Sequence, residues 1–137
     1  MNPIFYTTLE QSKKLKELGI VQESENAWFT YEKMGNEQTP SLHSFYHKNW
    51  QEEEQRAYRN YKFIASAFSV GELGLMLQRG TPNYISYMQM WSYRDAGEQI
   101  RSYDYEAQAR GEMLLDFLEA YSGEIKTINQ RYLEAIK

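Results

Sequence analysis

Residues 84–104 read YISYMQMWSYRDAGEQIRSYD, two runs of alternating side chains around a short turn. Alternation with a period of two is typical of a β-strand that has one covered face. A connection over residues 95–97 that ends in glycine is typical of a hairpin closed by a type I turn and a left-handed glycine. This turn would place Arg94 opposite Glu98 and Trp91 opposite Arg101. We therefore predict an antiparallel hairpin here.

One face of the predicted hairpin combines aromatic rings with an amide and an arginine. The candidate binding residues on this face are Tyr87, Gln89, Trp91, Tyr93, Arg101 and Tyr103. Exposed rings with such polar neighbours can stack on unpaired bases or anchor a protein partner. Alternatively, helices cover this face and its rings belong to the core, where large aromatic side chains usually lie. The sequence alone leaves both interpretations open.

The chain before the hairpin shows clear signals for a helix over residues 8–18. Thr7 and Glu10 match the capping box, in which each side chain accepts a hydrogen bond from a free backbone amide of the first turn. Gly19 can adopt the left-handed conformation that ends a helix, and Ile20 would then fold back onto Leu15. These signals agree with one another, so we predict both ends of this helix.

Further helices are predicted around the hairpin by the same kinds of signal. Ser69 and Glu72 form a second capping box, and this helix is expected to end at Gly80. After the hairpin, Asp104 is the expected cap of a third helix, and a break near residues 122–123 separates it from a fourth. The third and fourth helices are expected to pack as an antiparallel pair.

Two more strands are predicted before the hairpin, over residues 27–32 and 61–67. Residues 33–49 are expected to form a long loop, and residues 50–59 a weakly indicated helical segment. Because hairpins take the place of crossover connections, the order of elements favours an α+β fold. We expect an antiparallel sheet of about four strands, with the hairpin at its centre, packed against three or four helices.

Length and composition narrow the class of protein. A chain of 137 residues matches one domain, so we predict a single α+β domain over residues 1–137. With 42% hydrophobic and 25% charged residues, the chain is expected to be soluble rather than disordered or embedded in a membrane. Its first residues lack the pattern of a secretory signal, so we expect a cytoplasmic location. The net charge of −4 argues against general binding to duplex DNA.

Groups suited to catalysis are scarce in this sequence. The chain has no cysteine, which excludes disulfides, thiol nucleophiles and thiolate metal sites. His43 and His47 have a spacing that would place both rings on one face of a helix, and Glu52, Glu53 or Glu54 could add a carboxylate, which gives a set that suits zinc or iron. The segment lacks clear helical signals, and the glutamate of a metalloprotease motif is absent. We therefore favour two surface histidines, and we assign no catalytic residue, metal or cofactor.

Three blocks of the sequence carry a family resemblance. They are TTLEQSKKLKELGI followed by SENAWFTYEK, then ASAFSVGELGLMLQRG, and then the hairpin leading into YDYEAQARGEMLLDFLEAY. Together they cover about two thirds of the chain, and they resemble an uncharacterised group of small proteins encoded by phages and integrated mobile elements of gut bacteria. The resemblance implies a phage or prophage accessory protein, and it assigns no activity or site residue.

These observations lead to a functional hypothesis. Tyrosine and tryptophan are abundant here, and both residue types are enriched where protein interfaces carry binding energy. We expect a non-enzymatic interaction module that binds a protein partner or a second copy of itself. The alternative is a protein that binds single-stranded nucleic acid through the aromatic face of the hairpin.

Overall fold

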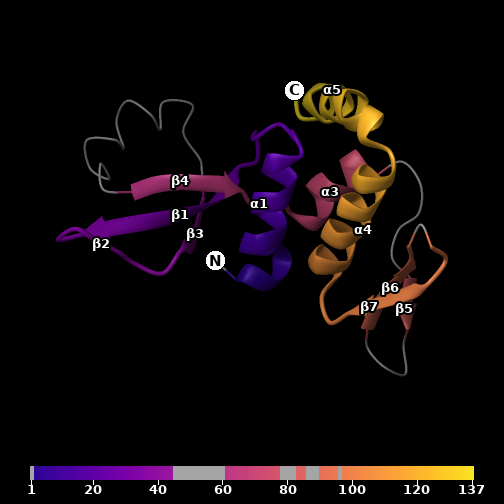
Figure 1. Ribbon diagram of the computed structural model, residues 1–137, viewed down its shortest axis with the longest axis horizontal. Coiled ribbons are helices and arrows are strands. Elements are labelled where there is room, and N and C mark those ends of the chain that lie inside the picture. The colour runs from indigo at the N-terminus through magenta and orange to yellow at the C-terminus, as the bar shows by residue number, and fades with distance from the viewer. Residues whose placement is uncertain (1, 45–60, 78–82, 86–89, 96) are drawn as a thin grey trace.

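The computed structural model describes residues 2–44, 61–77, 83–85, 90–95 and 97–137 and has an α+β fold (Figure 1). Its helices are η1 (Pro3–Phe5), α1 (Leu9–Glu17), α3 (Val70–Met76), α4 (Glu106–Ala120), η3 (Ser122–Glu124) and α5 (Ile125–Ala135). Its strands are β1 (Asn26–Lys33), β2 (Asn36–Glu37), β3 (Ser41–Ser44), β4 (Tyr61–Ser66), β5 (Asn83–Ile85), β6 (Met90–Arg94) and β7 (Ile100–Tyr103). The predicted α+β class is confirmed.

The described strands form two antiparallel sheets rather than one. In the larger sheet, β1 pairs with β2, β3 and β4, whereas β5, β6 and β7 form a separate three-stranded sheet. Figure 1 shows the helices between these two sheets, with α4 next to the smaller one. The predicted hairpin therefore lies in the smaller sheet, which we call the hairpin sheet, and not at the centre of a common one.

Helix α1 begins one residue later than its predicted start. Thr8 is the N-cap, and its capping box partner is Gln11. The Thr7 hydroxyl is buried instead, where it accepts a hydrogen bond from the Phe68 amide at 3.0 Å and pairs with Ser12 Oγ at 2.7 Å. The prediction of Thr7 as cap was therefore wrong, because tertiary contacts use its hydroxyl.

The C-terminal end of α1 has the expected form. Gly19 has a φ of 102°, a value that glycine adopts without strain. The Ile20 amide donates to the Leu15 carbonyl at 3.0 Å, and the Gly19 amide donates to the Lys16 carbonyl at 3.1 Å. This pair of bonds is the Schellman motif, so the predicted helix end is confirmed.

Helix α3 starts as predicted and is shorter than predicted. Ser69 and Glu72 form the capping box, and the flanking Phe68 and Leu73 are both fully buried. The helix ends at Met76, where the following residue turns to an extended conformation. Arg131 Nη1 of α5 donates to the Met76 carbonyl at 3.1 Å and so satisfies this end of the helix. The expected end at Gly80 lies outside the described residues.

Helix α4 starts without the predicted aspartate cap. Its N-cap is Tyr105, whose backbone is extended and whose side chain makes no capping hydrogen bond. Glu106 and Arg110, one turn apart, form an ion pair at 3.0 Å that joins the first turn to the second. The prediction of Asp104 as cap was wrong, because the chain enters the helix one residue later.

The helices pack around one buried hydrophobic cluster. The fourth predicted helix is present as α5, and it packs against α3 through Ile128 and Tyr132. The buried members of the described cluster are Leu15, Ile20, Phe68, Leu73, Met76, Leu114, Leu115, Leu118, Ile128 and Tyr132. Helices far apart in sequence therefore share a common core.

Part of the predicted loop over residues 33–49 forms strands in the structure. Met34 and Gly35 make a two-residue turn in which both residues have positive φ, 53° and 79°. Such a turn connects β1 to β2, and β3 then pairs with the first half of β1. The loop prediction was wrong for these residues, because a Met-Gly pair is an unusual sequence for this turn. Residues 45–60 lie outside the described part of the chain.

The hairpin between β6 and β7 has a different register from the predicted one. Tyr93 pairs with Arg101 and Trp91 pairs with Tyr103, so each partner is shifted by two residues. The Asp95 amide donates to the Gln99 carbonyl at 3.0 Å, which closes the loop one residue later than expected. Glu98, with a φ of 62°, occupies the left-handed position that was assigned to Gly97. A shift by two preserves which side chains share a face.

Candidate binding surfaces

The structure brings the described members of the predicted hairpin site together on one face. Tyr93 is 5% exposed, Trp91 and Tyr103 are half-buried, and Arg101 is exposed. Tyr87 and Gln89 lie outside the described residues. The face packs against α4, so this part of it is a contact within the chain rather than an open platform.

Tyr93 is the residue that joins the hairpin sheet to α4. Its hydroxyl donates to Asp116 Oδ2 at 2.5 Å, a short distance typical of a hydrogen bond to a charged acceptor. The rings of Tyr93 and Tyr103 are nearly parallel, with centroids 6.1 Å apart. Burial, together with the hydrogen bond to Asp116, raises the pKa of Tyr93 far above its ordinary value. The phenol is therefore a hydrogen-bond donor and not a base at neutral pH.

Arg101 links the turn of the hairpin to the same network. Its Nε donates to Asp95 Oδ2 at 3.0 Å and lies 4.0 Å from Asp116 Oδ2. The Gln99 amide donates to Asp95 Oδ1 at 2.9 Å, and this bond, followed by the one from Arg101, holds the pKa of Asp95 below its ordinary value. The hydrogen bond to Asp95 also raises the pKa of Arg101. Arg101 thus lies between the carboxylate of Asp95 in the turn and the carboxylate of Asp116 on α4.

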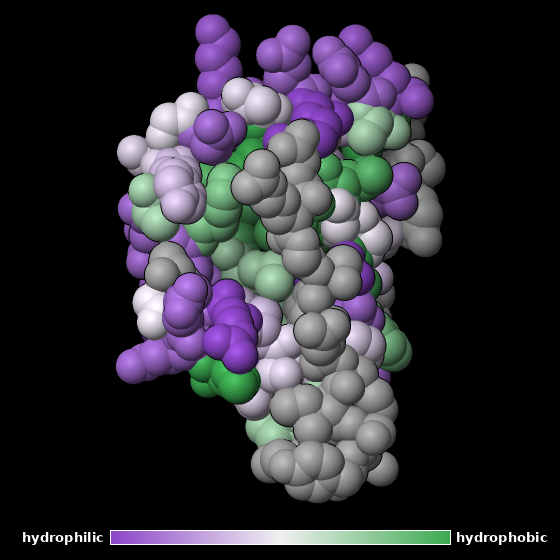
Figure 2. Space-filling model, turned by 90° about the vertical axis from the view of Figure 1, so that its right-hand side faces the viewer, coloured by the Kyte–Doolittle hydropathy of each residue, from purple (hydrophilic) through white to green (hydrophobic). Residues whose placement is uncertain are grey.

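A second aromatic pair lies on the outer surface of α4. Phe117 and Tyr121 are one turn apart, with ring centroids separated by 5.2 Å and exposed fractions of 37% and 58%. Ile100 of β7 is 63% exposed. Figure 2 looks onto the hairpin side of the molecule and shows hydrophobic surface near its middle, bordered by hydrophilic side chains.

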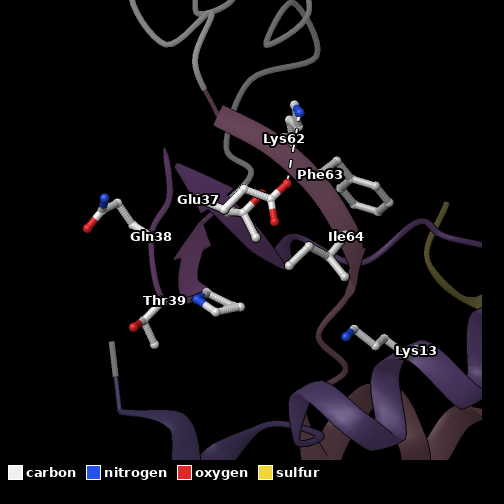
Figure 3. Close-up of a pocket in the computed structure, with 9 residues that line it drawn as sticks. Lys13, Glu37, Gln38, Thr39, Lys62, Phe63 and Ile64 are labelled. Carbon is white, nitrogen blue, oxygen red and sulfur yellow. Dashed lines mark ion pairs between the residues drawn. The ribbon is translucent and has the colours of Figure 1, made fainter. Parts of the chain in front are cut away.

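A shallow groove of about 680 Å³ lies between α1 and the larger sheet (Figure 3). It is open to solvent, and it is lined by Lys13, Thr30, Glu37, Gln38, Thr39, Pro40, Lys62, Phe63 and Ile64. Lys62 forms ion pairs with Glu32 at 3.2 Å and with Glu37 at 4.0 Å. Within the described part of the chain, this lysine is thus already neutralised at the rim of the groove.

The nearby Lys16 is also committed to contacts within the chain. Its ammonium donates to the Ile64 carbonyl at 2.9 Å and lies 5.2 Å from the centre of the Phe63 ring. Attraction between a cation and an aromatic face accounts for the second contact. Lys16 therefore attaches α1 to β4 beside the groove.

His43 lies on a strand, so the helical geometry proposed for a metal pair does not form at this position. Its Nε2 is 2.8 Å from Ser41 Oγ, and its ring makes edge contacts with Phe29 and Tyr61. His47 lies outside the described residues. Among the residues that the structure describes, no group of three or more His, Asp or Glu side chains could hold a metal ion.

The half-buried carboxylate of Glu72 accepts hydrogen bonds that hold parts of the fold together. Its Oε1 accepts from Ser24 Oγ at 2.9 Å and from the Ser69 amide at 3.0 Å, while its Oε2 accepts from the Tyr132 hydroxyl at 2.7 Å. Burial, together with the Glu72 contact, raises the pKa of Tyr132 well above its ordinary value. This carboxylate holds α3, α5 and the chain before β1 together.

Sequence reasoning missed two residues that organise these surfaces. Asp116 reads as one polar residue among several on an amphipathic helix, and no local pattern links it to Tyr93, 23 residues earlier. Gln11 is 4% exposed, and its Nε2 donates to the Gln108 carbonyl and to Glu112 of α4. Both contacts are long-range, so the sequence around each residue carries no signal for them.

Comparisons with known proteins returned no matching family model, no matching curated protein and no matching solved structure. In the described residues, no helix combines the length and the apolar character needed to cross a membrane.

Proposed function

We propose that this chain is a non-enzymatic interaction module that presents aromatic surface to a protein partner or to a second copy of itself. The observation that carries the proposal is the exposed Phe117 and Tyr121 pair on α4. Exposed aromatic residues on a rigid helix bury a large area on binding while losing little conformational freedom. Ile100 and Tyr105 are further exposed hydrophobic side chains among the described residues.

The charged side chains support the same proposal. Asp95, Asp116 and Glu72 all accept hydrogen bonds that hold elements of the fold together. A general acid or base needs a carboxylate that can reach a substrate proton. These carboxylates act instead as structural acceptors, which favours binding over catalysis.

The test replaces the ring pair and measures association. In the double variant Phe117→Ser and Tyr121→Ser, we expect loss of self-association in sedimentation velocity, or loss of a partner that the wild-type chain retains. Phe5→Ser, at another exposed aromatic position, is the matched control and should behave as wild type. A wild-type chain that stays monomeric at all concentrations and retains the same proteins as the double variant would contradict the proposal.

A second candidate function is binding to single-stranded nucleic acid. The observation that favours it is the exposed Arg101 on the same hairpin face as the half-buried Trp91 and Tyr103. Binding of this kind weakens steeply as salt increases, because phosphate contacts release counterions. Retention of the chain on a mixed oligonucleotide at low salt, with release at high salt and loss in Arg101→Gln, is the expected result. Equal retention of both proteins would reject this candidate.

The resemblance to phage and mobile-element proteins extends the proposal to a biological setting. We propose a cytoplasmic accessory protein, supported by the three sequence blocks that carry the resemblance and by the lack of cysteine. Genes for phage structural or regulatory proteins beside its own gene are the expected finding.

A further inference from the structure

One edge of the hairpin sheet is formed by β7. Among the described strands, β7 pairs with β6 alone, and β5 pairs with the opposite edge of β6. Ile100, Arg101 and Ser102 of β7 are all exposed, and the exposed fraction of Ile100 is 63%. This edge of the sheet is therefore accessible from solvent.

The hydrogen-bonding pattern indicates which backbone groups of β7 face outward. The Asp95 amide donates to the Gln99 carbonyl, so these two residues form a hydrogen-bonded pair. In an antiparallel ladder, such pairs alternate with pairs whose backbone groups point away from each other. The pairs that β6 forms with Ile100 and Ser102 are of the second kind. Within the described ranges, no hydrogen bond joins the outward groups of these two residues to another part of the chain.

The larger sheet has an edge strand with two protective features that β7 lacks. Among the described strands, β4 pairs with β1 alone, its register contains a bulge, and Lys16 of α1 donates to the Ile64 carbonyl at 2.9 Å. Bulges and lysine side chains are common means of preventing an edge from pairing with another chain. In contrast, β7 has a regular register with β6 and contains neither lysine nor proline. Its outward backbone groups are thus available to an additional strand.

We propose that β7 pairs antiparallel with β7 of a second copy, across a twofold axis at Ser102, so that the two hairpin sheets become one continuous sheet. The proposal goes beyond the function proposed above, because it uses a different element from the ring pair of Phe117 and Tyr121 on α4. Twofold pairing uses the same strand edge on both copies and is complete with two copies, which is the commonest arrangement of homo-oligomers.

The residues of β7 favour this register over the others. The outward residues of one copy pair with the outward residues of the other. A twofold axis at Ile100 or Tyr103 would pair most of β7 with residues outside the strand, and an axis at Arg101 would place two arginines opposite each other. An axis at Ser102 instead places each Arg101 opposite Tyr103 of the second copy, which pairs a cation with an aromatic ring. The strand is therefore complementary to itself.

The first experiment compares amide hydrogen exchange along β7 at low and high protein concentration. In the monomer, the amides of Ile100 and Ser102 face solvent, whereas the amides of Arg101 and Tyr103 are bonded to β6. The outward amides should exchange at least about tenfold more slowly in the dimer, while the two inward amides change much less. Outward amides that exchange at the same rate at all concentrations up to about 1 mM would overturn the proposal.

The second experiment removes one outward amide. Proline has no amide hydrogen, so at residue 102 it removes a bond to the second copy without removing a bond to β6. In sedimentation velocity, Ser102→Pro should raise the dissociation constant of the dimer at least about tenfold, because the bonds of this residue across the axis are lost. Ser102→Thr keeps the amide and is the matched control, which should associate like the wild type. Equal association of Ser102→Pro and the wild type would overturn the proposal.

The third experiment tests the register. If Ser102 lies on the twofold axis, Ser102→Glu places two carboxylates opposite each other, and Ser102→Lys places two ammonium groups there. Each variant alone should associate more weakly than the wild type, whereas an equimolar mixture of the two should form a heterodimer. Variants that associate as well alone as in the mixture would overturn the proposal.

The two proposals fail in different ways. If the double variant of Phe117 and Tyr121 loses self-association while Ser102→Pro keeps it, the ring pair is the interface and the pairing of β7 is wrong. If Ser102→Pro loses self-association while the double variant associates like the wild type, β7 is the interface between copies and the ring pair is not.

Discussion

The helical region of this protein shares ten buried hydrophobic side chains in its described cluster, whereas the described contacts of the hairpin sheet with α4 include a hydrogen bond from Tyr93 to the carboxylate of Asp116. Hydrophobic contacts in a shared core are individually weak and non-directional, and their combined contribution is large. A hydrogen bond to a carboxylate is directional, and removing either partner ends it. The comparison shows two ways of joining elements in the described part of the chain: a shared apolar core among the helices, and a directional bond to a carboxylate between the hairpin sheet and α4.

The largest expected effect comes from emptying the helical core. Leu114 is fully buried in the cluster between α4 and its neighbours. Leu114→Ala should lower the free energy of unfolding by about 2–5 kcal/mol, from lost burial and from the cavity left behind. Urea denaturation measures this loss. Leu75→Ala, at a position 40% exposed on α3, is the matched control and should cost less than about 1 kcal/mol. Similar losses in both variants would contradict the assigned core.

An intermediate effect is expected where α1 crosses α4. A Cβ on Gly111 would lie 2.8 Å from Gln11 Oε1, which is part of a buried and hydrogen-bonded amide. Gly111→Ala should therefore destabilise the protein by about 1–2 kcal/mol, since displacing this amide costs more than the gain in helix propensity. Gly71→Ala on α3 meets no atom closer than 4.0 Å and should be stabilising in the same thermal measurement. Stabilisation by both substitutions would show that Gln11 moves freely.

A smaller effect is expected from acid at the turn of the hairpin. The pKa of Asp95 in the folded chain is held below its ordinary value of 3.8. Its charged form therefore stabilises the turn above that ordinary value, and this stabilisation is lost as the pH falls through the lowered pKa. The Gln99 amide resonance, followed by NMR, should shift in this acidic range in the wild type and stay unchanged in Asp95→Asn. A transition that persists in the variant would assign it to another group.

The smallest expected effect is a gain in stability rather than a loss. Glu98 has a φ of 62°, which strains any residue with a Cβ. Glu98→Gly should stabilise the hairpin by about 0.5–1 kcal/mol, seen as a higher midpoint in thermal unfolding. Gly97 does not have positive φ, so Gly97→Ala should be close to neutral. A large loss of stability in Gly97→Ala, with no gain in Glu98→Gly, would contradict this turn. It would support the turn predicted from the sequence, in which Gly97 occupies the left-handed position.

The parts of the fold that could be predicted are those governed by neighbouring residues. The capping box of Ser69 and Glu72 and the left-handed Gly19 each depend on a few adjacent positions, and the structure contains both. The hairpin was predicted for the same reason. The register of the hairpin was predicted wrongly, because the left-handed position of the turn is occupied by Glu98 and not by the neighbouring Gly97.

The rest depends on contacts between distant parts of the chain. The local sequence predicts that Thr7 caps a helix, but in the structure its hydroxyl forms hydrogen bonds with the Phe68 amide and with Ser12 Oγ. The aromatic face of the hairpin could be named from alternation, yet only its partner Asp116 shows that α4 covers Tyr93. The split of the strands into two sheets likewise has no local signal, because it follows from where the helices place the hairpin.

Native-state hydrogen exchange on the wild-type chain tests the central comparison most directly. We predict that the amides of β6 and β7 exchange through an opening of lower free energy than the amides of α4 beside Leu114 and Leu118, so that the hairpin sheet opens while the helices stay folded. One common opening free energy for both sets of amides, equal to that of global unfolding, would contradict the account.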